Sequence, residues 1–291
     1  MLLLPTDPWP ETVKLVQRLE MLGYAHIWTY DHLSWRRYRD RAWHAAIPWL
    51  TGLAAATTTV RLGTMVSSPT VRHPVTLAKE AMTLDHVSGG RFTLGLGAGG
   101  AGFDAEVFGG HALTRSQRAD RLGEFVEAID QLLRQPATSF RGVYYTINDA
   151  RMLPGCVQQP RLPLAVAAAG KRTLAVAARH ADAWITYGDA TYQDSSPAGT
   201  ERIVRRQAGQ LAECCAAAGR DPAEIDRIYL VGNTAERPLA SIAAFTDFVG
   251  RYHALGFTDI VFHHPRPGDP IWADDPTIVE AIATQVLPQL H

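Results

Sequence analysis

Short apolar runs alternate with longer segments in which apolar residues recur at helical spacing, and this alternation continues along the whole chain. A short apolar run is typical of a buried strand, whereas spacing such as that of Leu122, Phe125 and Val126 predicts a helix with one buried face. The predicted strands are Leu2–Leu4, Ala25–Thr29, Val60–Val66, Arg91–Gly97, Pro163–Ala168, Ala183–Tyr187, Asp226–Gly232 and Thr258–His263. The predicted helices are Thr12–Leu22, His44–Ala56, Pro74–Val87, Ser116–Arg134, Arg172–Ala181, Glu201–Ala218, Leu239–Leu255 and Pro276–Leu290.

This order of elements predicts a closed barrel. Strands that alternate with helices form a parallel sheet, because each helix carries the chain back to the start of the next strand. Eight such units within 291 residues match a (β/α)8 barrel. We therefore expect an α/β fold, a (β/α)8 TIM barrel, in which residues 1–291 form a single domain.

Two insertions interrupt the regular alternation. Pro136–Leu162 follows the fourth predicted helix, and its segment Gly142–Thr146 is interpreted as a strand of a hairpin. The polar segment Gly188–Thr200 follows the sixth predicted strand. Because long loops after barrel strands usually carry function or act as lids, the second insertion is expected to lie near the active site.

Composition narrows the class of partner. The formal net charge is −1 and 46% of residues are hydrophobic, so nothing favours binding to nucleic acid or to an anionic membrane surface. Met1–Pro5 lacks the basic segment of a signal peptide, and no apolar run elsewhere is long enough to span a membrane. The cysteines Cys156, Cys214 and Cys215 fit a reducing compartment. We therefore expect a cytoplasmic protein without nucleic-acid or membrane partners.

The ends of the predicted strands carry the candidate chemistry, because barrel enzymes place their active sites there. Asp31 and His32 follow the second strand, and histidine exchanges protons near neutral pH. A histidine with a purely structural role is the alternative, but Tyr30 and Trp35 beside it suggest a pocket for flat rings. A rim of aromatic residues suggests a largely apolar substrate: Trp35, Trp43, Phe103, Tyr187 and Trp272. No zinc-type spacing is found, and neighbours on a strand such as His263 and His264 point to opposite faces, so no metal site is expected.

A glycine-rich loop, Gly97–Gly100, follows the fourth predicted strand. Bare backbone lets N–H groups approach a phosphate closely. Gly95, Gly97 and Gly100 also match the dinucleotide-binding pattern G-x-G-x-x-G. We reject that interpretation, because several βα units precede the loop and Ala101–Gly110 is expected to be irregular rather than helical.

A second candidate phosphate site lies at the start of the fifth predicted helix. Gly170, Lys171, Arg172 and Thr173 combine free helix N–H groups, two cations and a hydroxyl. The alternative is that Gly170 makes the turn and Thr173 caps the helix. Together with the glycine-rich loop, this helix start favours a phosphorylated cofactor on the barrel rim.

Several segments resemble the bacterial-luciferase-like family, and specifically its branch that uses the deazaflavin coenzyme F420. They are Tyr30–Leu33, Val60–Thr64, Thr70–Pro74, Thr83–Phe92 with Gly95–Gly99, and Ala178–Trp184. The resemblance implies a homodimer with a loosely held cofactor at the carboxyl ends of the strands, and a non-proline cis peptide at Met65–Val66 or one residue later. Together with the phosphate sites argued above, it gives two groups of site residues: the catalytic candidates His32, Asp31 and Trp35, and the cofactor-binding candidates Met65, Val66, Ser67, Gly97, Ala98, Gly99, Gly100, Ala169, Gly170, Lys171, Arg172, Thr173 and Tyr187.

The expected function is hydride transfer between coenzyme F420 and a small organic substrate at the barrel mouth. His32, oriented by Asp31, would supply or remove the companion proton. The bare backbone of 97–102 leaves room for a bulky phosphate-bearing tail, which favours the deazaflavin over FMN. The alternatives are an FMN-dependent monooxygenase fed by a separate reductase, and a non-catalytic flavin-binding barrel.

Overall fold

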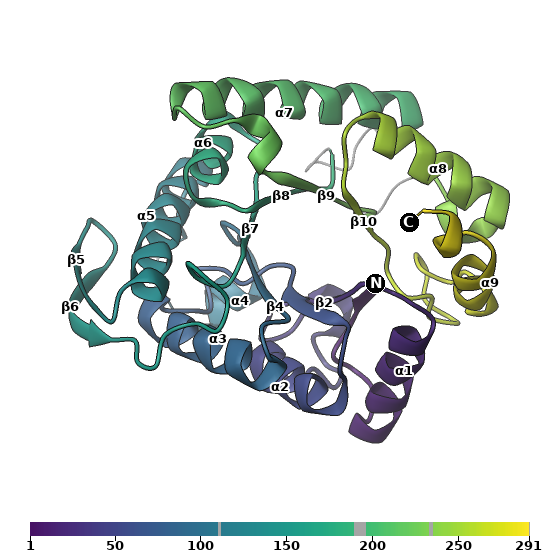
Figure 1. Cartoon of the computed structure of the whole chain (residues 1–291), viewed down its shortest axis with the longest axis horizontal. Helices are drawn as coiled ribbons and strands as arrows, with labels where there is room; N and C mark the ends of the chain where they lie inside the picture. Colours follow the sequence, from purple (N-terminus) through teal and green to yellow (C-terminus); the bar gives the residue numbers. More distant parts are fainter. Residues whose placement is uncertain (110–111, 189–195, 233–234, 291) are drawn as a thin grey trace.

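The computed structural model describes residues 1–109, 112–188, 196–232 and 235–290, and within them the predicted α/β barrel is confirmed. One eight-stranded sheet runs in the order β1, β2, β3, β4, β7, β8, β9, β10, and neighbouring strands are parallel (Figure 1). A bridge between Leu2 and His263 closes the ring. The strands are β1 (Leu2–Leu3), β2 (His26–Thr29), β3 (Arg61–Thr64), β4 (Phe92–Leu96), β7 (Leu164–Ala167), β8 (Ala183–Thr186), β9 (Asp226–Leu230) and β10 (Asp259–Val261).

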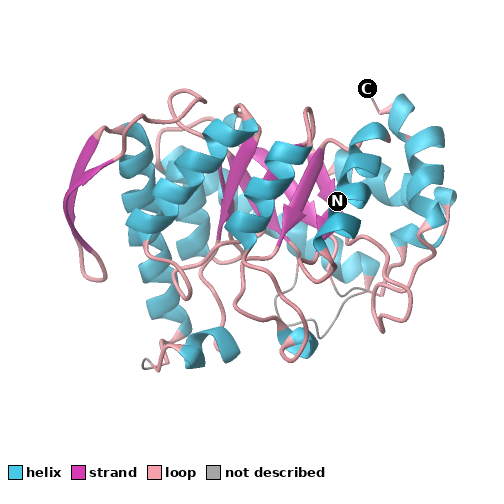
Figure 2. Ribbon diagram, turned by 90° about the horizontal axis from the view of Figure 1, so that it is seen from below, coloured by secondary structure: helices cyan, strands magenta, loops and turns pink. Residues whose placement is uncertain are grey.

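The long helices form a ring outside the strands (Figures 1 and 2). They are α1 (Trp9–Met21), α2 (Ala46–Ala56), α3 (Pro74–Ser88), α5 (Arg115–Arg134), α6 (Lys171–His180), α7 (Pro197–Ala217), α8 (Ile242–Ala254) and α9 (Thr277–Gln285). Each predicted helix is found, with shifted bounds. Helix α7 starts earlier than predicted because Ser196 caps it and Pro197 fits its first turn, whereas α9 ends before Pro288, which cannot continue a helix. None of the helices in the described ranges is long and apolar enough to cross a membrane.

The barrel interior is packed rather than hollow. Trp28 on β2 is 1% exposed, and its ring fills the barrel. A Cβ atom on Gly63 of β3 would lie 2.3 Å from the Trp28 ring, so the neighbouring strand has no room for a side chain there. Because the interior is filled, a ligand site is expected at the end of the ring where the loops after the strands gather, which is the barrel mouth.

The first insertion contains a hairpin of β5 (Ala137–Arg141) and β6 (Thr146–Arg151), which stands away from the barrel (Figure 2). The predicted strand Gly142–Thr146 is wrong, because most of it forms the turn between these strands. The carboxylate of Glu124 on α5 accepts hydrogen bonds from the backbone N–H groups of 143–145, and this fixes the turn. Part of the second insertion, 189–195, lies outside the described residues.

A second correction concerns the segment after the glycine-rich loop. Ala101–Gly110 is not irregular throughout, because Phe103–Val107 forms the short helix α4. Gly102 precedes it, and Asp104 and Glu106 lie in its first turn, where the helix dipole favours acidic side chains.

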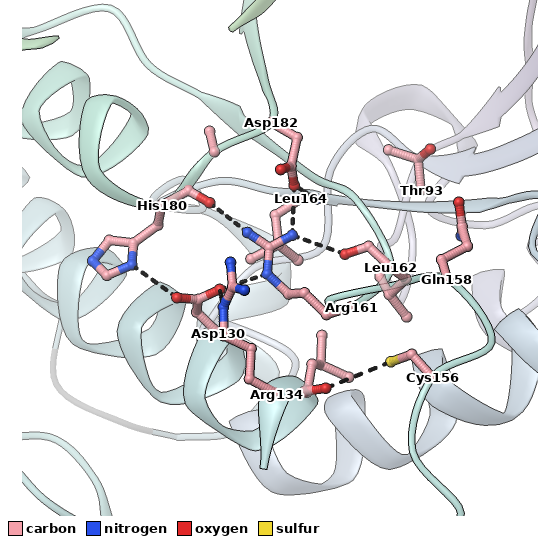
Figure 3. A network of polar contacts seen from close by, with 12 residues as sticks. Thr93, Asp130, Arg134, Cys156, Gln158, Arg161, Leu162, Leu164, His180 and Asp182 are labelled. Carbon is pink, nitrogen blue, oxygen red and sulfur yellow. Dashed lines mark hydrogen bonds and ion pairs between the residues drawn. The ribbon is translucent and has the colours of Figure 1, made fainter. Parts of the chain in front are cut away.

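An ion network around the buried Arg161 lies at the end of the barrel where the strands begin (Figure 3). Arg161, which precedes β7, bonds Asp130 on α5 and Asp182 before β8 at 2.5 Å each. It also donates to the carbonyl oxygens of His180 and Leu162. Because these residues lie at the amino ends of strands and carboxyl ends of helices, the network is structural and far from the mouth.

Candidate active site

His32 follows β2 and reaches across the barrel mouth to α4. Its Nδ1 contacts the Asp104 carboxylate, which also accepts hydrogen bonds from the backbone N–H groups of Leu33 (3.1 Å) and Ser34 (3.4 Å). The side chain of His32 is 34% exposed and that of Asp104 is 14% exposed. A half-buried imidazole held through one nitrogen leaves the other, Nε2, for a ligand in the mouth.

Asp31 points away from His32, so the prediction that Asp31 orients the imidazole is wrong. Its buried carboxylate accepts hydrogen bonds from the Ser67 hydroxyl (2.6 Å) and from the Arg72 guanidinium (2.7 and 2.9 Å). Neighbouring residues of an extended segment face opposite sides, which explains why the two cannot share one contact. Asp104 takes the orienting position, and the acidic first turn of α4 was the signal that could have revealed it.

The predicted non-proline cis peptide lies between Met65 and Val66, directly after β3. Backbone hydrogen bonds tie this segment to the end of β4: Ser67 N–H donates to Gly95 O (2.8 Å), and Gly97 N–H donates to Ser67 O (2.9 Å). A Cβ atom on Gly97 would lie 2.4 Å from Val66. Gly97 is therefore required by packing behind the mouth, and not only by the approach of a ligand.

The rest of the glycine-rich loop forms an open cradle beside a cation. Gly99 has a φ of +70°, and a Cβ atom there would lie 2.2 Å from the Thr70 hydroxyl, whereas nothing lies within 4 Å of one on Gly100. Arg121 of α5 donates to the same Thr70 hydroxyl at 3.4 Å, and its buried Nε has no hydrogen-bond partner. Bare backbone, a hydroxyl and an incompletely paired guanidinium suit a phosphate group. The sequence does not point to Arg121, because nothing in its helix pattern distinguishes it from a solvated arginine.

The start of α6 is engaged within the protein. Arg172 bonds Ser116 and pairs with Asp120 (3.2 Å), both on α5. The Thr173 hydroxyl accepts from Gly170 N–H (3.3 Å) and donates to Gly170 O (3.0 Å), as in the capping alternative. Roles for these residues in phosphate binding stay predictions, as do those of Ala169, Ala98 and the exposed Lys171.

Aromatic rings form a layered wall on the other side of His32. Trp35 lies 5.8 Å from Trp272 and 6.3 Å from Trp43, measured between ring centroids. Trp43 donates its indole N–H to His32 O (2.9 Å), so the wall also holds the backbone of the candidate catalytic residue. Tyr187 packs against the same cluster, whereas Phe103 lies under the Arg39 guanidinium (4.3 Å). The predicted rim is thus assembled around Trp35 and Trp272.

His263, after β10, extends this wall into the barrel. Its ring stacks on Trp272 at 3.8 Å, and its Nε2 bonds the Tyr30 hydroxyl at 2.9 Å. Burial, assisted by the charge of Arg266, holds the pKa of His263 well below its ordinary value, so this imidazole is neutral. The described residues include no cluster of His, Cys, Asp or Glu that could hold a metal ion.

Comparison with known proteins identifies relatives of this chain. A family model described as luciferase-like monooxygenase matches residues 1–256. The chain is 30% identical to the F420-dependent hydroxymycolic acid dehydrogenase of Mycobacterium tuberculosis, over 94% of this chain and 83% of the relative. It is 34% identical to the F420-dependent glucose-6-phosphate dehydrogenase of Kineococcus radiotolerans, over 72% of this chain and 59% of the relative.

A solved structure shows the same fold. An F420-dependent secondary alcohol dehydrogenase in complex with an F420–acetone adduct superposes with a TM-score of 0.82 at 16% identity, covering 100% of this chain and 99% of that one. At this identity the likeness concerns the fold alone. The family model and the sequence relatives go further, and by them the chain belongs to the luciferase-like monooxygenase family.

Proposed function

We propose that the protein is an F420-dependent oxidoreductase that transfers hydride between the deazaflavin and a small organic substrate at the barrel mouth. Relatives named as F420-dependent dehydrogenases support the cofactor and the reaction class. The observation that carries the proposal is the placement of His32. Asp104 holds it at the mouth, where its ring lies 6.5 Å from the Trp35 ring of the aromatic wall.

The residues present fit such a cofactor. The open position at Gly100 and the unpartnered Nε of Arg121 suit its phosphate, and the segment around Met65–Val66 gives a backing for a flat ring system. When bound, a deazaflavin supplies a ring carbon that gives or takes hydride, two electrons at a time. Trp35 would cover the mouth and exclude water from the reacting atoms.

Proton transfer falls to His32. The Asp104 carboxylate accepts a hydrogen bond from Nδ1, so the neutral ring carries its proton there and presents Nε2 as a proton acceptor. In the charged ring, Nε2–H donates instead. His32 can therefore remove the proton of a substrate alcohol, or return a proton to a carbonyl oxygen, at the same nitrogen.

A titration tests the cofactor. Purified protein is titrated with the deazaflavin coenzyme and, separately, with FMN, and binding is followed by fluorescence. We expect micromolar binding of the deazaflavin and much weaker binding of FMN. Tight FMN binding with oxygen-dependent turnover would instead support the monooxygenase, and deazaflavin binding without any hydride transfer across a panel of alcohols and ketones would support the non-catalytic barrel.

The remaining expectations stay predictions. We propose that residues 1–291 act as one barrel domain, that two copies form a homodimer, and that the protein works in the cytoplasm on a small-molecule substrate.

A further inference from the structure

Arginine side chains surround the aromatic wall at the barrel mouth. The guanidinium carbon of Arg266 lies 4.7 Å from the centre of the Trp272 ring, and that of Arg37 lies 5.3 Å from the same centre. Arg36 lies 5.0 Å from the centre of the Trp35 ring. These cations gather on the face of the mouth where the substrate is proposed to bind.

One buried carboxylate, Asp269, balances part of this charge. Arg37 donates to both of its oxygens at 2.6 Å, Tyr38 donates at 2.7 Å, and the backbone N–H groups of Ile271 and Trp272 complete its shell. Burial alone would raise its pKa, but these donors hold the pKa of Asp269 well below its ordinary value. Asp269 is therefore a fully engaged anion that is already matched to Arg37.

Arg266 is left incompletely paired. Its contact with Asp269 is 3.4 Å long, and so is its contact with the His264 carbonyl. Its Nη2 is buried without a hydrogen-bond partner, whereas 19% of the side chain as a whole is exposed at the mouth. A buried N–H group without a partner costs free energy, and an anion that accepts from it recovers that cost.

A cofactor phosphate at the glycine-rich cradle would not supply the missing partner of Arg266. In the ring order β1-β2-β3-β4-β7-β8-β9-β10, the strand that precedes the glycine-rich loop and the strand that precedes Arg266 lie half a barrel apart. His32 follows β2, between the two. The ring of Tyr30 links the sides, at 5.5 Å from the His263 ring and 6.0 Å from the His32 ring.

We infer that the substrate of the proposed reaction carries an anionic group, a phosphate or a carboxylate, which binds Arg266 while its reacting carbon lies at His32. The placement of the reacting carbon at His32 rests on the proposed function, whereas the binding of an anion at Arg266 does not depend on it. The flat wall of Trp35 and Trp272 receives the uncharged part of the molecule. Arg36 adds positive charge beside it, and no described carboxylate other than the matched Asp269 bonds Arg266.

The experiment uses the protein without cofactor and measures binding by calorimetry. The probes are phenyl phosphate and benzoate, each compared with a neutral partner, phenol or benzyl alcohol. We expect the anions to bind at least tenfold more tightly than the neutral compounds, because a charge-assisted hydrogen bond is worth at least that factor. A preference for only one anion identifies the group as phosphate or carboxylate.

Three variants locate the anion. Arg266→Gln should weaken phenyl phosphate binding at least tenfold, and Arg266→Lys should weaken it less. Arg179→Gln is the matched control, since it removes the same charge from an exposed position of α6 that bonds only its own helix. Circular dichroism and thermal melting check that each variant folds.

Two outcomes overturn the inference. One is equal binding of anions and neutral compounds. The other is loss of anion binding in Arg121→Gln together with normal binding in Arg266→Gln, which would place the anion at the glycine-rich cradle. Failure of the deazaflavin titration would overturn the proposed function separately, because the probe experiment contains no cofactor.

Discussion

At the scale of single residues, the two acidic residues beside His32, one adjacent in sequence and one in contact with its ring, have different roles. Asp104 holds His32, whereas Asp31 lies in a buried pair with Arg72 and Ser67. Asp104 therefore positions the candidate proton-transfer group, whereas Asp31 stabilises the segment around the mouth, although Asp31 is the residue next to His32 in the sequence.

We expect Asp104→Asn to lower turnover by about tenfold or more with little change in melting temperature, because the ring loses the acceptor that fixes its proton. His32→Ala should lower turnover by roughly 100-fold while cofactor affinity stays nearly unchanged. Asp31→Asn should instead lower the free energy of unfolding by about 3 kcal/mol, since the partly buried Arg72 loses its charged partner at 2.7 Å and keeps the longer contact with Glu80 at 3.4 Å. Steady-state kinetics and urea unfolding of the same preparations check all three. An Asp31→Asn variant that keeps full stability but loses turnover would reverse these roles.

The cofactor cradle gives a second prediction at this scale. Arg121→Gln should weaken deazaflavin binding about tenfold, because a charge-assisted hydrogen bond to the phosphate is lost. Thr173→Val tests the other candidate phosphate site, and binding should change less there, since the Thr173 hydroxyl already bonds Gly170. Gly99 is a poor position for this test, because its positive φ and its contact with Thr70 would strain any larger residue. Normal binding in Arg121→Gln and weak binding in Thr173→Val would move the phosphate to the start of α6.

At the scale of elements, Glu20 joins helix α1 to the loop before β3. Its carboxylate accepts hydrogen bonds from the backbone N–H groups of Thr58, Thr59 and Val60 at 2.6 to 2.9 Å. Burial acts to raise its pKa, but these bonds outweigh it and lower the pKa to about 2. A carboxyl group whose pKa is lowered on folding stabilises the protein above its ordinary pKa of 4.5, and this contribution is lost as the pH falls towards 2.

We therefore expect Glu20→Gln to be less stable than the wild type at pH 7, and the difference to shrink at pH 3. Urea unfolding at the two pH values measures it. A difference that stays constant between pH 7 and pH 3 would mean that the charge of Glu20 contributes nothing.

The same scale shows what sequence patterns can and cannot predict. The apolar pattern identified α5 because one of its faces is buried, and it identified strands such as β4 and β8 because both of their faces are buried. Helix α4 was missed because none of its residues is buried, and the start of α7 was missed because it depends on the Ser196 cap rather than on an apolar face. The pair of Arg172 with Asp120 was also out of reach, since it joins positions 52 residues apart whose contact only the folded barrel creates.

At the scale of the whole molecule, the barrel depends on a short closing strand. Leu2 of β1 is fully buried and pairs with both β2 and the segment after β10. We expect Leu2→Ala to lower the free energy of unfolding by about 3 kcal/mol, the usual effect of a cavity in a packed core. Leu153→Ala, at a position 64% exposed, is the matched control and should change stability by less than about 0.5 kcal/mol. Equal effects in denaturant unfolding would show that the ring does not depend on this residue.

The seam between the first strand and the last has a consequence for when the protein becomes active during its synthesis. His264 N–H bonds Leu2 O at 2.9 Å, and the neighbouring His263 side chain bonds Tyr30 at the mouth. The segment that seals the ring is therefore the one that brings the last groups to the substrate side. A chain still growing on the ribosome can fold its early βα units, but it has no working mouth until this segment emerges and docks. We therefore expect a chain truncated before this segment to be inactive, even where its earlier βα units fold.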